Sequence, residues 1–347
     1  MRYRTLGRTG LRLSELGFGA WGIGNTSWIG ADDQSSIQAL KVARDAGVNF
    51  FDTALVYGRG HSEELIGRLF GNSEEVVISS KVPPKNGKWP MPHGIPLRDA
   101  FPKEHVLECL AKSVRNLQRR AIDLYHFHVW SDEWAGDPEW LETVETIRKS
   151  GLARFVSISI NDHEPENVLK ALDSGLIDSV QVIYNIFDQS PEKHLFPYCE
   201  AHGIGVVARV PFDEGGLTGM IRLDTTFPDG DFRNRYFGGT RKQEVVERVG
   251  RLLADLDITA DHLPSISLRF CISHAAVTSV IAGMRKPEHA RRNAEAASEG
   301  PLEPDMVKKL RQHIWARNFY SSPAPGLSER VSESAQRISK LIYALTK

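Results

Sequence analysis

The sequence is poor in cysteine, lacks long apolar runs and carries almost no net charge. Its three cysteines, Cys109, Cys199 and Cys271, are odd in number and far apart. That spacing suits neither a disulfide framework nor a zinc knuckle, so we interpret them as buried thiols in a reducing compartment. The 43 Lys and Arg nearly balance the 44 Asp and Glu, so no whole-molecule field favours nucleic acid or an anionic membrane.

Membrane and export signals are also missing from the sequence. No run approaches the roughly 18 apolar residues that cross a bilayer, and the start, MRYRTLGRTG, has no apolar core after its charges. We therefore expect a cytoplasmic protein with neither membrane nor nucleic-acid partners. With 41% hydrophobic and 25% charged residues, the chain is long enough to bury one barrel or two small domains.

Strand-like and helix-like segments alternate along most of the chain. Residues 2–16 alternate around two glycines and predict a small hairpin before the main fold. Eight strand-like segments follow, each with a helix-like segment after it, and glycines mark several helix ends. The strand-like segments are the run from Leu16, then 48–52, 76–81, 123–128, 153–160, 179–185, 204–211 and 278–283. The glycines are Gly47, Gly71, Gly151, Gly175 and Gly203.

This rhythm predicts an α/β protein built as a (β/α)8 TIM barrel over about residues 16–300, preceded by the hairpin. No repeat or linker divides the chain, so we expect a single domain over residues 1–347. A helical tail is expected from about residue 304 to the end. Its apolar residues recur at helical spacing: Val331, Ile338, Leu341, Ile342 and Leu345.

Three of the strand-like segments end on ionisable residues. These are Asp52, Lys81 and His128, and Tyr57 follows Asp52 after five residues. The carboxyl ends of parallel barrel strands face one mouth, where polar residues are more often catalytic than stabilising. Singly, Asp52 could be a helix cap, Tyr57 a loop aromatic and Lys81 a strand-end charge. Together they form a set that can deliver one proton to an oxygen while another group supplies hydride.

Each member of this set has an expected role. An ammonium at Lys81 would favour the phenolate of Tyr57 and lower the pKa of the phenol. The Asp52 carboxylate would keep Lys81 ionised and aimed, and His128 would orient a carbonyl oxygen or assist proton transfer.

Other classes of protein fit the motifs less well. Gly17, Gly19 and Gly22 match G-x-G-x-x-G, but Trp21 interrupts the motif and helical periodicity begins only near Asp33. A dinucleotide fold needs a helix at the last glycine, so we expect a barrel strand here instead.

The pair His126 and His128 forms H-x-H on one strand face, as in barrel metallohydrolases. Later strands supply no further ligands, so we expect no metal and interpret His126 as a barrel-interior residue. A glycosidase would need two facing carboxylates, and only Asp52 is suitably placed. The later strand-like segments end in Ser159, Asn185, Arg209 and Gly283.

Four of the quoted residues lie in motifs that resemble the aldo-keto reductase family. The segments FFDTALVYGRGHSEELIGR, SSK and DLYHFH occur in family order, and the resemblance runs from about Tyr3 to Ala297. It implies that Asp52, Tyr57, Lys81 and His128 are a catalytic tetrad. Tyr57 would be the general acid in carbonyl reduction and the base in the reverse direction.

The resemblance also implies an NADP(H) site, and its nicotinamide end falls on three strands. Gln181 in SVQVIYN is similar to the family residue that binds the carboxamide, and Ser159 keeps its family position. The Asn that usually follows is Ile160 here, with Asn161 one place late. Arg209 replaces a frequent aromatic, and its planar guanidinium can also stack on nicotinamide.

The rest of the cofactor is expected to lie along two later segments. Arg285 in IAGMRKPEHARRN is the expected ligand of the 2′-phosphate, which a guanidinium can grip bidentately. Arg292 replaces a frequent Glu of the family. The alternative to a phosphate site is that this basic run is simply a solvent-exposed helix face. The remaining family positions are Pro211, Gly215, Leu217 and Thr218 at the pyrophosphate, and Gly283, His289 and Asn293 at the adenosine.

We therefore expect an oxidoreductase that interconverts an aldehyde or ketone with its alcohol, as a monomer or small homo-oligomer. NAD remains possible, because Gly283 offers no side chain to a 2′-phosphate, and an NAD-dependent sugar or alcohol dehydrogenase is one alternative. A nucleotide-binding regulatory subunit without turnover is another, motivated by the tail after Gly326. Trp21, Trp28, Trp89 and Trp130 lie in predicted mouth loops, and Trp21 and Trp89 are the expected walls of the substrate pocket.

Overall fold

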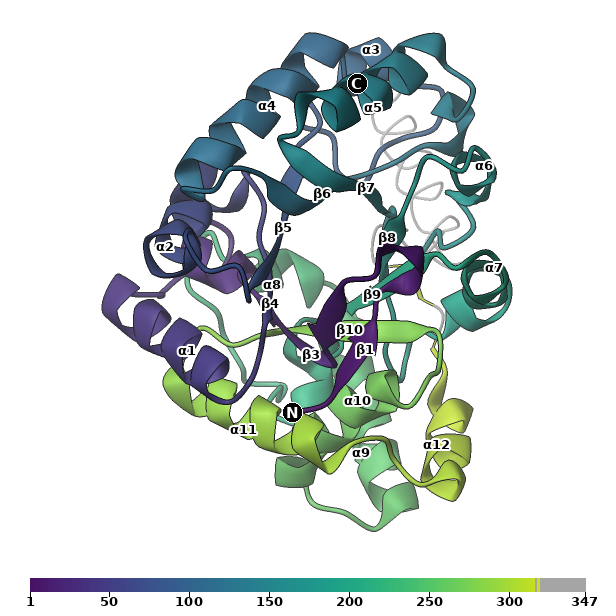
Figure 1. The fold of residues 1–347 in the computed structure, drawn as a ribbon. Helices are drawn as coiled ribbons and strands as arrows, with labels where there is room; N and C mark the ends of the chain where they lie inside the picture. The colour runs from purple at the N-terminus through teal and green to yellow at the C-terminus, as the bar shows by residue number, and fades with distance from the viewer. Residues whose placement is uncertain (316, 319–347) are drawn as a thin grey trace, which may run out of the picture. The chain divides into compact units, whose positions relative to one another are not determined.

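Eight parallel strands close into a barrel with helices around it (Figure 1). The computed structural model describes residues 1–315, 317 and 318. Each strand pairs with the next along the chain, and the last pairs with the first, so the predicted barrel is confirmed. The strands are β3 (Leu16–Gly19), β4 (Phe50–Asp52), β5 (Val77–Val82), β6 (Ile122–Phe127), β7 (Ala153–Ser159), β8 (Ser179–Ile183), β9 (Gly205–Arg209) and β10 (Val277–Gly283).

The helices between the strands begin and end on local signals. In α1 the Asp32 side chain accepts a hydrogen bond of 2.8 Å from the Ser35 N–H, which satisfies a free donor of the first turn. Gly71 is the C-cap of α2, as predicted, and it keeps a right-handed conformation with a φ of −54°. The main helices are α1 (Asp33–Asp45), α2 (His61–Phe70), α4 (Lys103–Asn116), α5 (Pro138–Ser150), α6 (Leu169–Asp173), α7 (Leu195–His202), α9 (Arg241–Leu256), α10 (Leu263–Ile272) and α11 (Pro287–Glu299).

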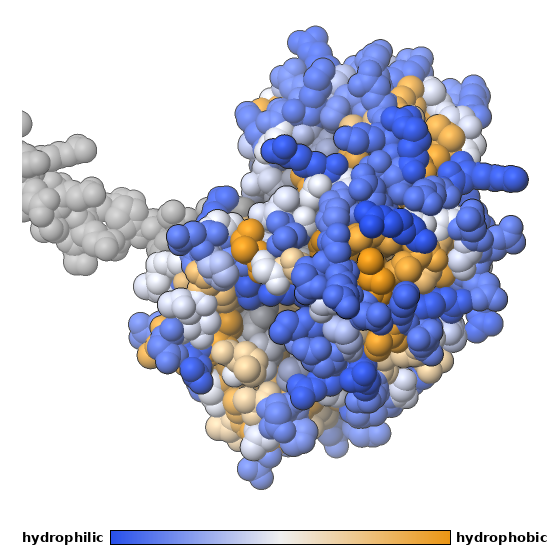
Figure 2. All heavy atoms as spheres, turned by 90° about the vertical axis from the view of Figure 1, so that its left-hand side faces the viewer, coloured by the Kyte–Doolittle hydropathy of each residue, from blue (hydrophilic) through white to orange (hydrophobic). Residues whose placement is uncertain are grey.

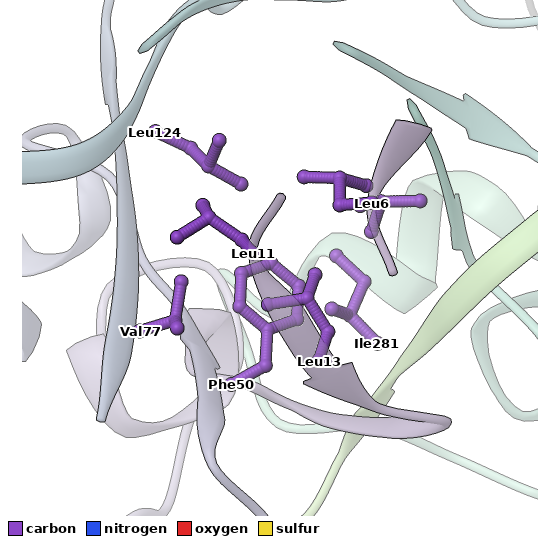
Figure 3. Close-up of a cluster of buried hydrophobic side chains, with 8 residues drawn as sticks. Leu6, Leu11, Leu13, Phe50, Val77, Leu124 and Ile281 are labelled. Atoms are coloured by element: carbon purple, nitrogen blue, oxygen red, sulfur yellow. The ribbon is translucent and has the colours of Figure 1, made fainter. Parts of the chain in front are cut away.

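The predicted amino-terminal hairpin is also confirmed. Strand β1 (Tyr3–Thr5) pairs antiparallel with β2 (Arg12–Ser14) across one end of the barrel. Its leucines pack into the barrel interior and form an apolar plug (Figure 3). Hydrophobic contacts therefore close this end of the barrel, and a polar site is expected at the other end, where the carboxyl ends of the strands lie. The plug consists of Leu6, Leu11, Leu13, Phe50, Val77, Leu124, Val207 and Ile281.

The glycines of the G-x-G-x-x-G match serve barrel packing. A Cβ on Gly17 would lie 2.7 Å from Phe50 Cδ1 and 2.9 Å from Ile281 Cγ2, which leaves no room for a side chain. The last glycine lies in the short 3₁₀ turn η2 (Trp21–Gly24), and no α-helix opens there. The segment is thus a barrel strand, as predicted.

The long loops at the mouth contain short helices that the sequence did not predict. Helix α3 (Leu97–Ala100) lies in the loop after β5, and α8 (Phe232–Tyr236) lies in the insertion after β9. The insertion is tied to the first loop, because Phe232 N–H donates to Ser27 O at 2.8 Å and Ile29 N–H donates to Asp231 at 3.1 Å. The mouth is therefore bordered by two loops from distant parts of the chain.

The residues up to Ala316 form one compact unit. The expected tail begins with α12 (Pro304–Leu310), while its apolar residues from Val331 to Leu345 lie outside the described residues. A single domain over the whole chain thus stays a prediction. Figure 2 shows the side of the barrel that carries α1 and α2, where hydrophilic residues predominate and hydrophobic ones form separate patches. Among the described helices, none has the length and apolar character needed to cross a membrane.

Candidate active site

Asp52 and Lys81 form a buried ion pair at the carboxyl ends of β4 and β5. Lys81 Nζ donates to Asp52 Oδ2 at 2.6 Å and to the Thr53 carbonyl at 2.7 Å. The second carboxylate oxygen accepts from Ser79 Oγ at 2.6 Å and from Gln181 Nε2 at 2.8 Å. The side chains of Lys81 and Asp52 are 0% and 2% exposed, so protein groups fix the carboxylate from three sides.

Tyr57 and His128 lie next to this pair. Tyr57 opens the 3₁₀ turn η3 (Tyr57–Gly60), which follows β4, and its hydroxyl lies 3.4 Å from His128 Nε2. The Lys81 ammonium lies 5.3 Å from the centre of the Tyr57 ring. The structure therefore brings all four predicted residues together at one mouth.

Glycine makes the position of Tyr57 possible. Gly58 has a φ of +65°, and a Cβ there would lie 2.4 Å from the Gly24 carbonyl oxygen. Only glycine fits such a close approach in this backbone conformation without strain. The first loop and the turn that carries Tyr57 are consequently packed backbone to backbone.

The protonation states of these groups follow mainly from burial. Burial lowers the pKa of His128 well below its usual value, and the Lys81 charge lowers it further, so the imidazole is neutral. Burial also lowers the pKa of Lys81, while the Asp52 charge and hydrogen bond oppose this shift. A neutral imidazole can donate one hydrogen bond and accept another, which suits a group that orients a carbonyl oxygen.

The expected lowering of the Tyr57 pKa was wrong. Burial raises the pKa of Tyr57 well above 10, and the Asp52 charge raises it further. The Lys81 ammonium is paired with Asp52 at 2.6 Å, so the two charges largely cancel at the phenol. The hydroxyl therefore keeps its proton, which is the state that a proton donor requires.

Two of the predicted tryptophans flank the tetrad. The Trp21 ring centre lies 6.3 Å from that of Tyr57, and the Trp89 ring lies 4.3 Å from that of His128 at an interplanar angle of 88°. Trp28 packs against Trp21 at 6.0 Å. Trp130 lies in the loop after β6, as predicted, but its ring is 0% exposed because it packs among core aromatic residues, so it does not line a pocket.

The predicted nicotinamide contacts lie on β7 and β8 beside the tetrad. Ser159 and Gln181 are register partners and both are buried. The displaced Asn161 binds the loop after β5: its Oδ1 accepts from Met91 N–H at 3.2 Å, and its Nδ2 donates to Met91 O at 3.0 Å. Asn161 is thus occupied with loop anchoring, a role that sequence reasoning missed because its partner is 70 residues away.

Arg209 at the end of β9 belongs to a charged group that the sequence did not reveal. Its guanidinium donates to Ile160 O at 3.0 Å and forms an ion pair with Asp162. Glu214 lies near these charges, and burial, with Asp213 and Asp162, raises its pKa to about 8. The signal for Glu214 was in the segment PFDEGG, where two adjacent acidic residues stand among apolar residues and glycines.

The loop after β9 presents its four predicted residues differently. Pro211 is buried, and Gly215 has a φ of +105° with open space where a Cβ would be. Thr218 Oγ1 donates to Gly215 O at 2.6 Å. Leu217 is 0% exposed, its N–H donates to Phe212 O at 2.9 Å, and its carbonyl accepts from Ser267 at 3.1 Å. Leu217 therefore shapes the loop from inside and has no free group for a ligand in this conformation.

The amino end of α11 carries the predicted adenosine contacts. Arg285 donates to Ile29 O at 2.8 Å, and burial, with the nearby Arg233 charge, lowers its pKa. Asn293 is 7% exposed, and its Nδ2 has no hydrogen-bond partner among the described residues. Gly283, the last residue of β10, is exposed, and His289 is half-buried. Two close guanidinium groups, a buried free donor and a helix N-terminus fit an anionic nucleotide group.

Comparisons with known proteins agree with this geometry. The family model described as Aldo/keto reductase family matches residues 15–314. The chain is 29% identical to the Aldo-keto reductase YhdN of Bacillus subtilis (strain 168) over 259 residues, which cover 73% of this chain and 75% of that relative. It is 28% identical to the NADH-specific methylglyoxal reductase of Escherichia coli (strain K12), covering 85% of this chain and 93% of that protein.

Two further relatives cover nearly the whole length. The chain is 27% identical to the probable voltage-gated potassium channel subunit beta of Arabidopsis thaliana, covering 91% of this chain and 98% of that protein. The solved structure of aldo-keto reductase AKR11C1 from Bacillus halodurans (holo form) matches with a TM-score of 0.71 and 26% identity, covering 92% of this chain and 99% of that one. The barrel, the four polar groups at its mouth and these matches together show that the chain belongs to the aldo/keto reductase family and is an oxidoreductase of that family.

Proposed function

We propose that this protein is an NADP(H)-dependent carbonyl reductase that also oxidises the corresponding alcohol, with Tyr57 as general acid and base. One observation carries the proposal. The Tyr57 hydroxyl lies 3.4 Å from a neutral His128 and beside the buried Lys81–Asp52 pair. A proton donor next to a hydrogen-bond donor at a barrel mouth can protonate and orient a single carbonyl oxygen.

Three residues of the tetrad would each have a separate role in carbonyl reduction. A dihydronicotinamide cofactor, when bound, would supply the hydride for the carbonyl carbon. His128 donates a hydrogen bond to the carbonyl oxygen, and Tyr57 transfers its proton to the same oxygen as negative charge develops there. The Lys81 ammonium stabilises the phenolate that remains, because the positive charge lies near the ring. In the oxidation of an alcohol the same phenolate accepts the proton.

The cofactor would be held at both ends of the site. Gln181 and Ser159 would face the nicotinamide, and Arg209 would offer its planar guanidinium. The loop with Pro211 and Gly215 would border the pyrophosphate, with Leu217 supporting it from behind. At the far end Arg285 would bind the 2′-phosphate, and the free amide of Asn293 supports an adenosine contact nearby, with His289 and Gly283 beside it.

An NAD preference is the second candidate within the same chemistry. The similar reductase of E. coli is named NADH-specific, and Gly283 has no side chain to offer a 2′-phosphate. Isothermal titration with NADPH and NADH separates the two candidates. We expect NADPH to bind more tightly through Arg285, whereas tighter binding of NADH would overturn the proposed preference.

The substrate is proposed to be a small carbonyl compound or alcohol that fits between Trp21 and Trp89. Trp89 is 37% exposed, and both rings lie against tetrad residues, so the reacting group would sit between two aromatic walls. We further propose a cytoplasmic protein that works without nucleic acid or membrane partners, as a monomer or small homo-oligomer.

The direct test is turnover of a carbonyl panel with NADPH by the wild type and by Tyr57→Phe. We expect Tyr57→Phe to bind NADPH normally and to lose about 100-fold or more in kcat, because general acid catalysis contributes that much. Equal turnover by the two proteins would remove Tyr57 from the mechanism. NADPH binding without turnover on any carbonyl would favour the alternative of a nucleotide-binding regulatory subunit; one similar protein is named a probable voltage-gated potassium channel subunit beta.

A further inference from the structure

His126 is a buried polar residue that the proposed mechanism does not use. It points into the barrel from β6, directly beside Lys81 on β5 and Ser157 on β7 in the strand register. Its side chain is 0% exposed. On β8 the Ser179 side chain also points inward, and its hydroxyl oxygen lies 2.6 Å from that of Ser157. Polar side chains from four adjacent strands, β5 to β8, thus lie in one layer of the barrel interior.

Neither ring nitrogen of His126 has a hydrogen-bond partner among the described residues. Burial, with the Lys81 charge, lowers the pKa of this imidazole to about 3, so it is neutral and has one donor and one acceptor to satisfy. Buried side-chain polar atoms in proteins are nearly always hydrogen-bonded to protein or to ordered water. A neutral imidazole aimed into a polar layer therefore implies a partner that is not a side chain.

The neighbouring Lys81 ammonium has a hydrogen-bond donor that a water could use. Lys81 has three N–H groups, and within the described part of the chain two of them donate to protein oxygens, those of Asp52 and Thr53. The Ser157–Ser179 hydroxyl pair uses one of its two hydrogens internally. A buried water typically makes about three hydrogen bonds to groups of this kind. One water can accept from Lys81, donate one hydrogen to the acceptor nitrogen of His126 and donate the other to the Ser157–Ser179 hydroxyl pair.

We propose that His126 is a positioning residue for Lys81: through a buried water it solvates the ammonium from inside the barrel and keeps it charged beside Tyr57. The inference rests on the proposed function for its kinetic consequence only. Without this polar contact Lys81 would face a drier interior, which favours its neutral form. The charged and titratable groups around Lys81 and His126 are Asp52, Tyr57, Glu63, His128 and Arg209.

The first test compares pH profiles of kcat/KM for carbonyl reduction in the wild type, His126→Leu and His126→Gln. Loss of the Lys81 proton is expected to limit activity on the alkaline side. In His126→Leu the alkaline fall of kcat/KM should begin at a pH lower by about one unit or more, because an apolar side chain cannot bind the water. His126→Gln, which has both a donor and an acceptor, should restore the wild-type profile.

An unchanged alkaline limb in His126→Leu, with only a lower Tm, would show that His126 is merely structural and would overturn the proposal. A downward shift of equal size in His126→Gln would also overturn it, because the polar contact would then not be the cause.

The second test does not need turnover. The Lys81 ammonium can be titrated by ¹⁵N NMR in lysine-labelled protein, with Lys81→Met used only to assign the signal. The pKa of Lys81 should fall in His126→Leu and return in His126→Gln, even if the wild type proves inactive. Inactivity with this shift present would refute the proposed function and leave the positioning role intact, whereas an unmoved Lys81 signal would refute the positioning role alone.

Discussion

Lys81 shows how burial and pairing act together on a single residue. Its ammonium is 0% exposed and would be costly to keep charged without Asp52 at 2.6 Å. Burial, followed by the Asp52 charge, raises the Tyr57 pKa, because the pairing with Asp52 leaves little of the Lys81 field to oppose them. Residue types could not predict this sign, because it depends on which partner each charge finds.

Removing one partner of the Lys81–Asp52 pair should destabilise the protein more than replacing both partners by neutral residues. Lys81→Met leaves the Asp52 carboxylate buried and unpaired, so we expect the free energy of unfolding to fall by about 3–5 kcal/mol. The double variant Asp52→Asn with Lys81→Met should recover much of that loss, because neither charge remains. Urea unfolding followed by tryptophan fluorescence measures both. Asp52→Asn is also measured alone. If the double variant lost as much free energy of unfolding as Lys81→Met and Asp52→Asn added together, the pairing would be contradicted.

Glu214 should make stability depend on pH. Burial raises its pKa from 4.5 to about 8 in the folded chain, so the unfolded chain loses this proton first as pH rises. Stability should therefore fall between pH 4.5 and about 8 by this contribution, and Glu214→Gln should remove the fall.

Thermal unfolding at several pH values checks this expectation. The advantage of Glu214→Gln over the wild type should grow from pH 4.5 to above pH 8. Glu64→Gln, on an exposed face of α2, serves as the control. An advantage of Glu214→Gln that stays constant with pH would show that Glu214 ionises normally.

At the scale of elements, the strands and long helices could be predicted from sequence, and the mouth loops could not. Apolar periods of two and of about 3.6 residues are local signals. The helix α8 and the loop after β5 instead depend on distant partners: Asp231 binds Ile29, and Asn161 binds Met91. No local pattern encodes such contacts, so both loops read as irregular segments.

The loop that leads into α11 should determine the affinity for the 2′-phosphate. Arg285→Ala should weaken NADPH binding by about 10-fold to 100-fold, because hydrogen bonds to a charged group contribute about 1.5–3 kcal/mol. NADH binding should change by less than about twofold, since it lacks the phosphate. Isothermal titration gives both constants. Arg292→Ala, which changes an exposed residue of α11, is the control, and an equal loss in the control would contradict a specific role for Arg285.

At the scale of the whole molecule, the barrel separates stability from chemistry. The hairpin leucines close one end, and the four polar groups lie at the carboxyl ends of strands at the other. The order of polar residues at strand ends therefore predicted the site from sequence, because every such end opens to one mouth. Trp130 shows the limit: the sequence predicted its loop position correctly, but it could not predict that side-chain packing buries the ring.

A cavity in the plug should lower stability without lowering activity. Leu13→Ala should reduce the free energy of unfolding by about 2–5 kcal/mol, because Leu13 is 0% exposed in the apolar cluster. The kcat of the folded enzyme should stay within about twofold of wild type, since strand-end chemistry is independent of the plug. Urea unfolding and steady-state assays on the same preparation measure both quantities. Leu223→Ala, which truncates a side chain that is 63% exposed, should change neither.

The most direct measurement follows deuterium from NADPH that carries deuterium at both C4 positions of the nicotinamide. With wild type and an accepted carbonyl substrate, mass spectrometry should find one deuterium on the carbinol carbon of the alcohol. Tyr57→Phe should bind the same cofactor and form at least about 100-fold less labelled alcohol in the same time, because the oxygen receives no proton. Alcohol formed without deuterium, or labelled equally fast by Tyr57→Phe, would contradict hydride transfer coupled to the Tyr57 proton.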